Sequence, residues 1–310
     1  MLEKMAKKYI SRLFNLPNIR YNKELIRHQS INSFMVSKKK LNDKNNKTRE
    51  NIIGSIINNQ IPDEYFHYCK RWRNLKLAIY GYIKKLEPDF KTIKCYHKGG
   101  RGFNYDFMIE FDGIKKYNIE LKFNSKFIST TPQFVSPMNP SQYMTNSYEE
   151  FYYHNYLPIL SRFLNIPLPE KETYLKNIHN NTSVMISQYQ KIYYEGCKSS
   201  SKFTNDPRAI DFYNLAKKIS SESIETFIKN NELNSSKMSD YLKKSQDDKI
   251  YMLFYQGKFY LEKNEDDYKI INITKTKNQF ICHTESGKKI KILLRWKNGN
   301  GISFPAFQIS

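Results

Sequence analysis

The sequence predicts an α/β protein with an N-terminal basic helical arm and a β-rich C-terminal region. Three patterns indicate this class. Residues 62–85 repeat apolar side chains at the helical spacing of three and four. Residues 105–123 alternate apolar and polar side chains, as half-buried strands do, and residues 249–296 contain short strands separated by turn residues.

Composition excludes a disordered chain and predicts a polyanionic partner. The 310 residues are 39% hydrophobic and 15% aromatic, which is enough to build one large domain or a domain with an appendage. The formal net charge is +21 and the isoelectric point is near 9.5. A field of this sign attracts nucleic acid first and an anionic membrane surface second.

Cysteine usage and hydropathy predict an intracellular protein. Cys69, Cys95, Cys197 and Cys282 are far apart and form no CxxC pair, which excludes a zinc ribbon and a disulfide framework. No run approaches the eighteen apolar residues of a membrane span, and the N-terminus lacks the apolar core of a signal peptide. We expect a soluble cytoplasmic or nuclear protein with no membrane partner.

Residues 1–50 form the expected arm, and residues 51–310 form the expected domain, whose β-rich part begins near residue 250. The arm carries thirteen Lys or Arg against four Asp or Glu, and residues 37–49 have the composition of a polar basic linker. Two interpretations remain open for the arm: a solvated segment, or an electrostatic contact to a phosphate backbone.

A helix over 62–85 is followed by a strand over 92–97 and a loop rich in glycine and basic residues at 98–102. A Walker phosphate loop requires Gly-Lys followed by Ser or Thr at the start of a helix, and here a strand follows. We therefore interpret the loop as a flexible turn whose Lys98 and Arg101 contact a nucleic-acid backbone.

Residues 105–111 and 117–123 form the expected hairpin, joined by an Asp-Gly turn. The two apolar faces coincide only when paired residue numbers have an even sum. Two registers leave a loop of about three residues. They place Asp106 opposite Glu120, or opposite Lys122 and diagonal to Glu120. Directly paired side chains have Cβ atoms roughly 5 Å apart and diagonal ones roughly 7–8 Å.

Either register gathers two carboxylates and one ammonium group on the polar face of the hairpin. Carboxylate oxygens at that separation are suited to Mg²⁺, which takes a few protein carboxylates and retains several waters. The hairpin therefore predicts a metal site with a positive charge beside it.

The rest of the chain alternates loop, helices and short strands. Residues 124–147 are a long irregular segment placed to frame the hairpin, and helices are expected over 148–164, 174–194, 207–230 and 235–244. Strands are expected within 249–261 and over 268–274, 279–284 and 289–296. The segment from Leu294 to Gly301 is either an ordinary hairpin or a nucleic-acid-contacting loop, with Arg295 and Lys297 as its contact residues.

Asp106, a thirteen-residue gap and Glu120-x-Lys122 together resemble the signature of the PD-(D/E)XK nuclease superfamily. The order of elements at 62–86, 92–123, 148–164 and 249–256 is similar as well. The resemblance implies a restriction-endonuclease-like core with a central mixed sheet flanked by helices. Tyr105 stands where the signature has proline. A literal Pro88-Asp89 also exists, but a whole expected strand separates it from the hairpin, so Asp106 is preferred.

The resemblance also implies a role for each signature residue. Asp106 and Glu120 would hold Mg²⁺, for which Mn²⁺ can substitute, with the Leu121 backbone carbonyl as an extra ligand. Lys122 would orient the attacking water and stabilise charge in the transition state.

Three further residues are candidates for the same site. An acidic residue on the first helix completes some sites of this superfamily, and Glu64 is the candidate here. Glu110 shares the polar face of the first hairpin strand. Gln190, with Tyr194, resembles the Gln-x3-Tyr element of the RecB-like branch.

The sequence thus predicts a Mg²⁺-dependent nuclease that cuts DNA internally. One alternative is an RNA endonuclease of the same fold, for which His97 is the only nearby histidine ligand. Another is a catalytically inactive nucleic-acid-binding protein. An anionic-membrane binder is disfavoured because the basic residues are spread along the chain. A homodimer is one of the open oligomeric states.

Overall fold

A computed structural model describes residues 15–35, 42–99, 103–128, 139–179, 197–198, 202–203, 207–296 and 305–310. The chain divides into two compact units. The N-terminal unit comprises Met1–Pro132 and Gln246–Glu265, and the C-terminal unit comprises Gln133–Ser245 and Asp266–Ser310. The chain therefore leaves the first unit after Pro132 and returns to it for twenty residues before completing the second.

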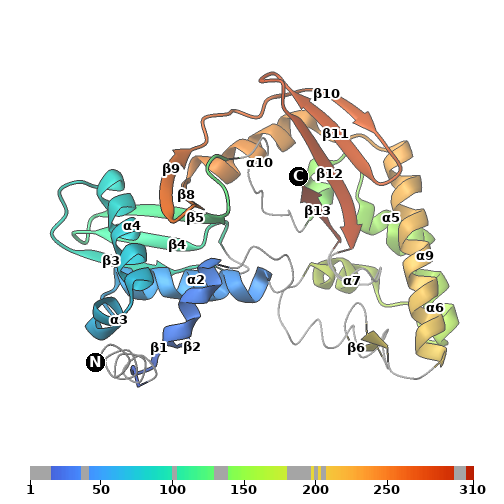
Figure 1. The fold of residues 1–310 in the computed structure, drawn as a ribbon. Coiled ribbons are helices and arrows are strands. Elements are labelled where there is room, and N and C mark those ends of the chain that lie inside the picture. The colour runs from blue at the N-terminus through green and yellow to red at the C-terminus, as the bar shows by residue number, and fades with distance from the viewer. Residues whose placement is uncertain are drawn as a thin grey trace. The chain divides into compact units, whose positions relative to one another are not determined.

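A five-stranded sheet forms the centre of the N-terminal unit (Figure 1). Its order is β3 (Ile93–His97), β4 (Phe107–Phe111), β5 (Lys115–Phe123), β8 (Lys249–Tyr255) and β9 (Lys258–Lys263). Neighbouring strands are antiparallel except β5 and β8, which are parallel. The expected central mixed sheet is confirmed. Parallel neighbours need a long connection, and here it includes the first segment of the C-terminal unit.

Helices cover the apolar face of this sheet. Helix α2 (Asn42–Ile57) contacts β3, and α4 (Lys70–Leu86) contacts β9. The alternation in β4 has the predicted consequence: Phe107, Ile109 and Phe111 are buried in one core with both helices, while the intervening side chains are half-buried. Burial of this face fixes which side of the hairpin carries the polar residues.

The expected polar linker at 37–49 is wrong for its described part, because α2 already begins at Asn42. Upstream lie β1 (Ile19–Tyr21), β2 (Glu24–Ile26) and η1 (His28–Met35). Arg49 explains why a basic segment folds here. Its guanidinium donates to the Ser33 carbonyl from Nε at 2.9 Å and Nη2 at 2.7 Å, and it lies 3.4 Å from the Phe123 ring centroid. Burial lowers the pKa of Arg49 to about 10.

Two expected helices are each divided in the structure. The 62–85 helix is α3 (Asp63–Tyr68) and α4, separated by Cys69 in an extended conformation. Arg73 stabilises this break because its Nη1 donates to the carbonyls of Phe66 and His67 at the end of α3, at 2.8 and 2.6 Å. The 148–164 helix is α5 (Tyr148–Asn155) and α6 (Leu157–Leu164). Pro158 divides it, since proline lacks an N–H and its ring clashes with the preceding turn.

The C-terminal unit packs helices against one face of a four-stranded antiparallel sheet (Figure 1). Its strands are β10 (Ile270–Lys275), β11 (Gln279–Thr284), β12 (Lys289–Trp296) and β13 (Pro305–Ile309), in chain order. Its remaining elements are η2 (Pro140–Tyr143), α7 (Lys171–Ile178), β6 (Cys197–Lys198), β7 (Lys202–Phe203), α9 (Pro207–Asn230) and α10 (Ser235–Asp247).

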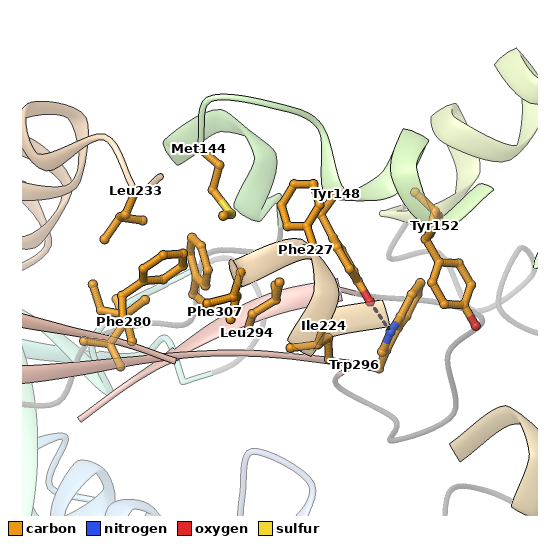
Figure 2. Close-up of a cluster of buried hydrophobic side chains, with 14 of the residues drawn as sticks. Met144, Tyr148, Tyr152, Ile224, Phe227, Leu233, Phe280, Leu294, Trp296 and Phe307 are labelled. Atoms are coloured by element: carbon orange, nitrogen blue, oxygen red, sulfur yellow. Dashed lines mark hydrogen bonds between the residues drawn. The ribbon is translucent and has the colours of Figure 1, made fainter. Parts of the chain in front are cut away.

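Aromatic side chains from the sheet and the helices form the core of this unit, as Figure 2 shows. Phe280 and Phe307 come from the strands, and Phe227 comes from α9. Tyr148 and Trp296 join the two layers through a hydrogen bond in which Trp296 Nε1 donates to the Tyr148 hydroxyl at 2.9 Å.

Most of the later expectations are confirmed. Strands at 279–284 and 289–296 are β11 and β12, and helices at 207–230 and 235–244 are α9 and the first part of α10. The 268–274 strand begins two residues late, at Ile270, and β13 was not expected. The 174–194 helix begins at Lys171, and its part beyond residue 179 lies outside the described residues, as does 129–138 of the expected irregular segment.

We predict that Tyr148→Phe destabilises the protein by about 1–3 kcal/mol, because it leaves the buried Trp296 N–H without its acceptor. The same change also removes a 2.9 Å hydrogen bond between the Tyr148 hydroxyl and Ser223 Oγ. Urea unfolding followed by circular dichroism measures the difference. Tyr156→Phe is the matched control, since its hydroxyl makes only a 3.4 Å exposed contact to Thr226. Equal effects of the two changes would contradict the prediction.

Candidate active site

The β4–β5 hairpin has the first of the two registers that the sequence allows. Phe107 pairs with Ile119 and Phe111 pairs with Lys115, which leaves a three-residue turn at 112–114. The paired residues begin at Phe107, so Asp106 lies just outside this register. Asp106 N also donates to the Ile119 carbonyl at 2.9 Å, so the residue is tied to β5 although it precedes β4.

Asp106 is held on both its backbone and its side chain. Its carboxylate Oδ2 accepts from Leu121 N at 2.9 Å. Its carbonyl accepts from Lys98 N at 2.8 Å and from Gly99 N at 3.1 Å, which fastens the loop after β3 to the start of β4. The carboxylate therefore has a fixed position rather than a choice of rotamers.

Glu120 and Lys122 lie two residues apart on the polar face of β5. Glu120 is only 7% exposed, although it is charged and in a strand. Lys122 Nζ donates to Glu120 Oε1 at 2.7 Å, so the ammonium group is held beside the carboxylate that the sequence paired with it. The arrangement is the two carboxylates and one cation expected for this hairpin.

A third acidic residue comes from α2 rather than from α3. His97 Nε2 lies 3.3 Å from Glu50 Oε2. A Cβ built on Gly99 would lie 3.3 Å from that histidine nitrogen and 3.7 Å from both Glu50 Oε2 and Asp106 Oδ1. Three titratable side chains therefore converge on one glycine. Glu64 lies exposed on α3, and no described hydrogen bond or ion pair brings it to this group, so the helix acid here is Glu50.

Lys249 is a buried lysine that sequence reasoning missed. It opens β8 opposite Asn118 of β5, on the same face of the sheet as Glu120, and it is 3% exposed. Its Nζ donates to the Asn104 carbonyl at 3.2 Å. Burial lowers the pKa of Lys249, against the opposing effect of the Glu120 carboxylate. Lys249 was overlooked because a lysine before an apolar strand normally marks its exposed end.

Negative charge is concentrated around Asp106. Burial raises the pKa of this carboxyl to about 8, and the Glu120 and Glu50 carboxylates act in the same direction. The Leu121 N–H and the Lys122 ammonium lower the pKa but do not cancel the rise. A pKa raised by burial and by neighbouring carboxylates is typical of catalytic and metal-binding sites.

The donor types at this site suit a hard divalent cation. Within the described ranges, no three His, Cys, Asp or Glu side chains stand close enough to one another to form a metal centre by themselves. Mg²⁺ does not need three, since it binds to one or two carboxylates and retains waters. The Asp106 and Glu120 carboxylates supply the oxygens, and the Glu50 carboxylate lies close enough to act on the pKa of Asp106. The residues fit Mg²⁺ or Mn²⁺ in donor chemistry.

The other predicted carboxylates are not brought to this group. Glu110 lies four residues beyond Asp106, roughly 13 Å along the strand. It pairs with Lys116 at 3.4 Å and accepts from the Tyr96 hydroxyl at 3.4 Å. Asp89 is exposed beyond the end of α4.

The predicted nucleic-acid contacts have different outcomes. Lys98 is half-buried beside Asp106, with its Nζ 4.9 Å from the Phe103 ring centroid. Arg295 lies in β12 of the C-terminal unit. Arg101, Gln190 and Lys297 lie outside the described residues.

Comparison of the chain with known protein families, with curated proteins and with solved structures finds no match. Over the described part of the chain, no helix combines the length and the apolar character needed to cross a membrane.

We predict that Asp106→Asn stabilises the protein at pH 7.5 in EDTA, because burial and the neighbouring carboxylates raise the pKa of Asp106 in the folded state. The folded pKa lies above the unfolded value, so this group disfavours folding once the pH exceeds its unfolded pKa, and the full effect is present above about 8. Thermal and urea unfolding measure the change. Mg²⁺ should then raise the unfolding temperature of the wild type more than that of the variant.

Asp112→Asn is the control of opposite sign. Hydrogen bonds from the backbone N–H groups of Thr92 and Lys91 lower the pKa of Asp112, so its charge supports the folded state and its removal should reduce stability. A destabilised Asp106→Asn variant would contradict the interpretation of Asp106 as a residue under electrostatic strain.

Proposed function

We propose that the protein is a Mg²⁺-dependent endonuclease that hydrolyses phosphodiester bonds of DNA. The observation that carries the proposal is the Asp106 carboxylate held by Leu121 N close to the Glu120 carboxylate, with Lys122 hydrogen-bonded to Glu120. A phosphodiester repels an incoming nucleophile by its own charge. Cleavage therefore needs positive charge at the phosphoryl oxygens and an oriented water.

The order of elements supports a restriction-endonuclease-like core. Helices α2 and α4 lie on one face of β3–β4–β5, and the strand that returns after the intervening helices, β8, pairs in parallel with β5. We propose this fold for the N-terminal unit. The C-terminal unit is then an addition to that core, inserted between β5 and β8 and continued after β9.

Each residue has a distinct role in the proposed reaction. Asp106 and Glu120 would bind the metal, with the Leu121 carbonyl as an extra ligand, and the bound metal would supply positive charge at the phosphoryl oxygen. Lys122 would leave its hydrogen bond with Glu120 to orient the attacking water and stabilise charge in the transition state. The buried Lys249 would place a second ammonium group near the Glu120 carboxylate.

Glu50 adds a third carboxylate to this site, and it comes from helix α2. In the structure its Oε2 lies 3.3 Å from His97 Nε2, so the imidazole stands beside this carboxylate before substrate arrives. We propose that Glu50 binds the waters of the metal or the metal itself. Glu50 replaces Glu64 in the role expected for the helix acid.

We predict that the wild type relaxes supercoiled circular DNA in Mg²⁺ and that EDTA abolishes this activity. Lys122→Ala and Glu50→Gln should each lower the cleavage rate at least about 100-fold, since each removes a charge that acts on the transition state or on the metal. A circular substrate has no ends, so its cleavage also separates internal cutting from digestion of termini. Gel electrophoresis of the products gives the rates.

Glu64→Gln is the matched control, because it makes the same chemical change on an exposed helix position outside the cluster. It should retain activity within about twofold, as surface substitutions usually do. The nuclease proposal fails if the wild type cuts no nucleic acid, or if the EDTA sample and the Lys122→Ala variant cut as fast as the wild type. Binding without cleavage would support the inactive nucleic-acid-binding alternative.

A second candidate is an RNA endonuclease of the same fold, and the position of His97 favours it. The imidazole lies beside Glu50, and its Nδ1 is buried without a hydrogen-bond partner. Neutral imidazole is a common metal ligand, and in this candidate His97 would bind the metal beside the carboxylates.

The His97→Ala variant separates the two candidates. If DNA is the substrate and His97 only orients Glu50, we expect His97→Ala to lower DNA cleavage less than Glu50→Gln does. If RNA is the substrate, single-stranded RNA is cut faster than DNA in Mn²⁺, and His97→Ala abolishes that activity. Parallel assays on labelled RNA and DNA of one sequence provide the comparison.

A further inference from the structure

Within the described residues, the helices that share a core with the sheet of the C-terminal unit pack on one of its faces. The opposite face is exposed at Lys289 and Lys291, whereas Ala306, which pairs with Arg295, is buried.

Phe280, Leu294 and Phe307 point from β11, β12 and β13 into the helical core. The side chains between them point the other way, and they include Lys289 and Lys291, both exposed. We call these outward positions of β10–β13 the outer sheet face.

The outer sheet face is cationic and has no acidic residue. None of the strands β10, β11, β12 and β13 contains Asp or Glu. Lys289, Lys291 and Arg295 alternate along β12, and His283 of β11 pairs directly with Lys289. Since a strand advances about 3.4 Å per residue, the row from Lys289 to Arg295 extends about 20 Å.

Four lysines of the same unit, Lys269, Lys275, Lys277 and Lys288, each form an ion pair with a carboxylate, and we call them the margin lysines. The lysines on the outer sheet face form no such pair within the described residues. Lys269 pairs with Glu285 at 3.1 Å, Lys277 with Glu225 at 3.8 Å and Lys275 with Glu232. Lys288, in the turn before β12, pairs with Asp266 at 2.7 Å.

Among the residues that the structure describes, no carboxylate lies within ion-pair distance of Lys289, Lys291 or Arg295. In addition, Arg295 Nε is buried and has no hydrogen-bond partner. Like charges in one row repel each other, so an unneutralised row of this kind costs stability unless an anion binds to it.

The chemistry of the face indicates which part of a nucleic acid it contacts. Proteins that hold single strands on a sheet stack bases on exposed aromatic rings. The outward positions of the described strands carry no Phe, Tyr or Trp. Cations without aromatic rings contact phosphates and carry no sequence information.

We propose that the outer sheet face binds the phosphate backbone of double-stranded DNA, independently of sequence. The choice of DNA rests on the proposed function, whereas the choice of a phosphate backbone rests on the face itself. The C-terminal unit would then hold the duplex, a task distinct from the chemistry assigned to the N-terminal unit.

The test measures binding by the full chain in EDTA, where cleavage does not contribute. The probe is a fluorescein-labelled DNA duplex of about 20 base pairs at about 100 mM salt, with affinity followed by fluorescence anisotropy over a salt series. The face variant is Lys289→Gln/Lys291→Gln/Arg295→Gln. Its control, Lys269→Gln/Lys275→Gln/Lys277→Gln, removes the same net charge from the neutralised margin. Circular dichroism and urea unfolding establish that both variants are folded.

We expect the face variant to bind the duplex at least about tenfold more weakly and to show a salt slope smaller by about 2–3, corresponding to three lost phosphate contacts. The control should change affinity less than about threefold, as removal of paired surface charges does. If Arg295→Gln impairs folding, Lys289→Gln/Lys291→Gln is compared with Lys269→Gln/Lys275→Gln under the same criteria, with a salt slope smaller by about 2.

The proposal is overturned if both variants weaken binding equally, if neither does, or if only single-stranded DNA, duplex RNA or anionic vesicles depend on the face. These outcomes are distinct from those for the nuclease. A chain that binds duplex through this face and never cuts it contradicts the proposed function alone. A chain that cuts DNA while its face variant binds normally contradicts this inference alone.

Discussion

The register of β4 against β5 is the constraint on which the N-terminal unit depends. A shift of one residue would expose Phe107 and Ile109 and turn the charged residues toward α2 and α4. The turn helps to prevent this shift. Asp112 and Gly113 take φ values of +52° and +71°, and Asp112 Oδ1 accepts from two backbone N–H groups at the start of β3. The apolar core thus determines where the carboxylates lie.

The same register brings together a group of charged side chains that are not part of the hydrophobic core. Asp106, Glu120 and Glu50 lie close enough to raise the pKa of Asp106 to about 8, and two lysines are placed among them. One of these, Lys249, is almost wholly buried. Replacing buried charges by well-packed hydrophobic side chains of similar volume is often neutral or stabilising. Charged residues kept in an unfavourable environment are typical of sites that bind or transform a ligand.

The C-terminal unit shows the complementary pattern. Its core is a dense aromatic layer, in which Trp296 Nε1 donates to the Tyr148 hydroxyl. Its described lysines beside and on the sheet divide into those paired with carboxylates, such as Lys269, Lys277 and Lys288, and the unpaired Lys289 and Lys291 of β12. This difference between two sets of surface lysines, rather than the net charge of +21, singles out one face.

Local patterns in the sequence were sufficient for the elements with strong periodicity. Alternation predicted the β4–β5 hairpin, restricted its register to two choices and placed Asp106, Glu120 and Lys122 on one face. The same kind of pattern predicted α9, β11 and β12. The break at Cys69 was not predicted, because it depends on Arg73 donating to the carbonyls at the end of α3. The break at Tyr156 was encoded by Pro158 and was overlooked.

Only the tertiary structure showed which residues far apart in the sequence lie together in the fold. β8 and β9 belong to the sheet of the N-terminal unit, although they follow more than a hundred residues of the other unit, and no local pattern encodes that return. Glu50 and Lys249 reach the hairpin only because α2 and β8 pack against it. Sequence periodicity determines which way a side chain faces within its own element, whereas packing between distant elements decides which side chains meet.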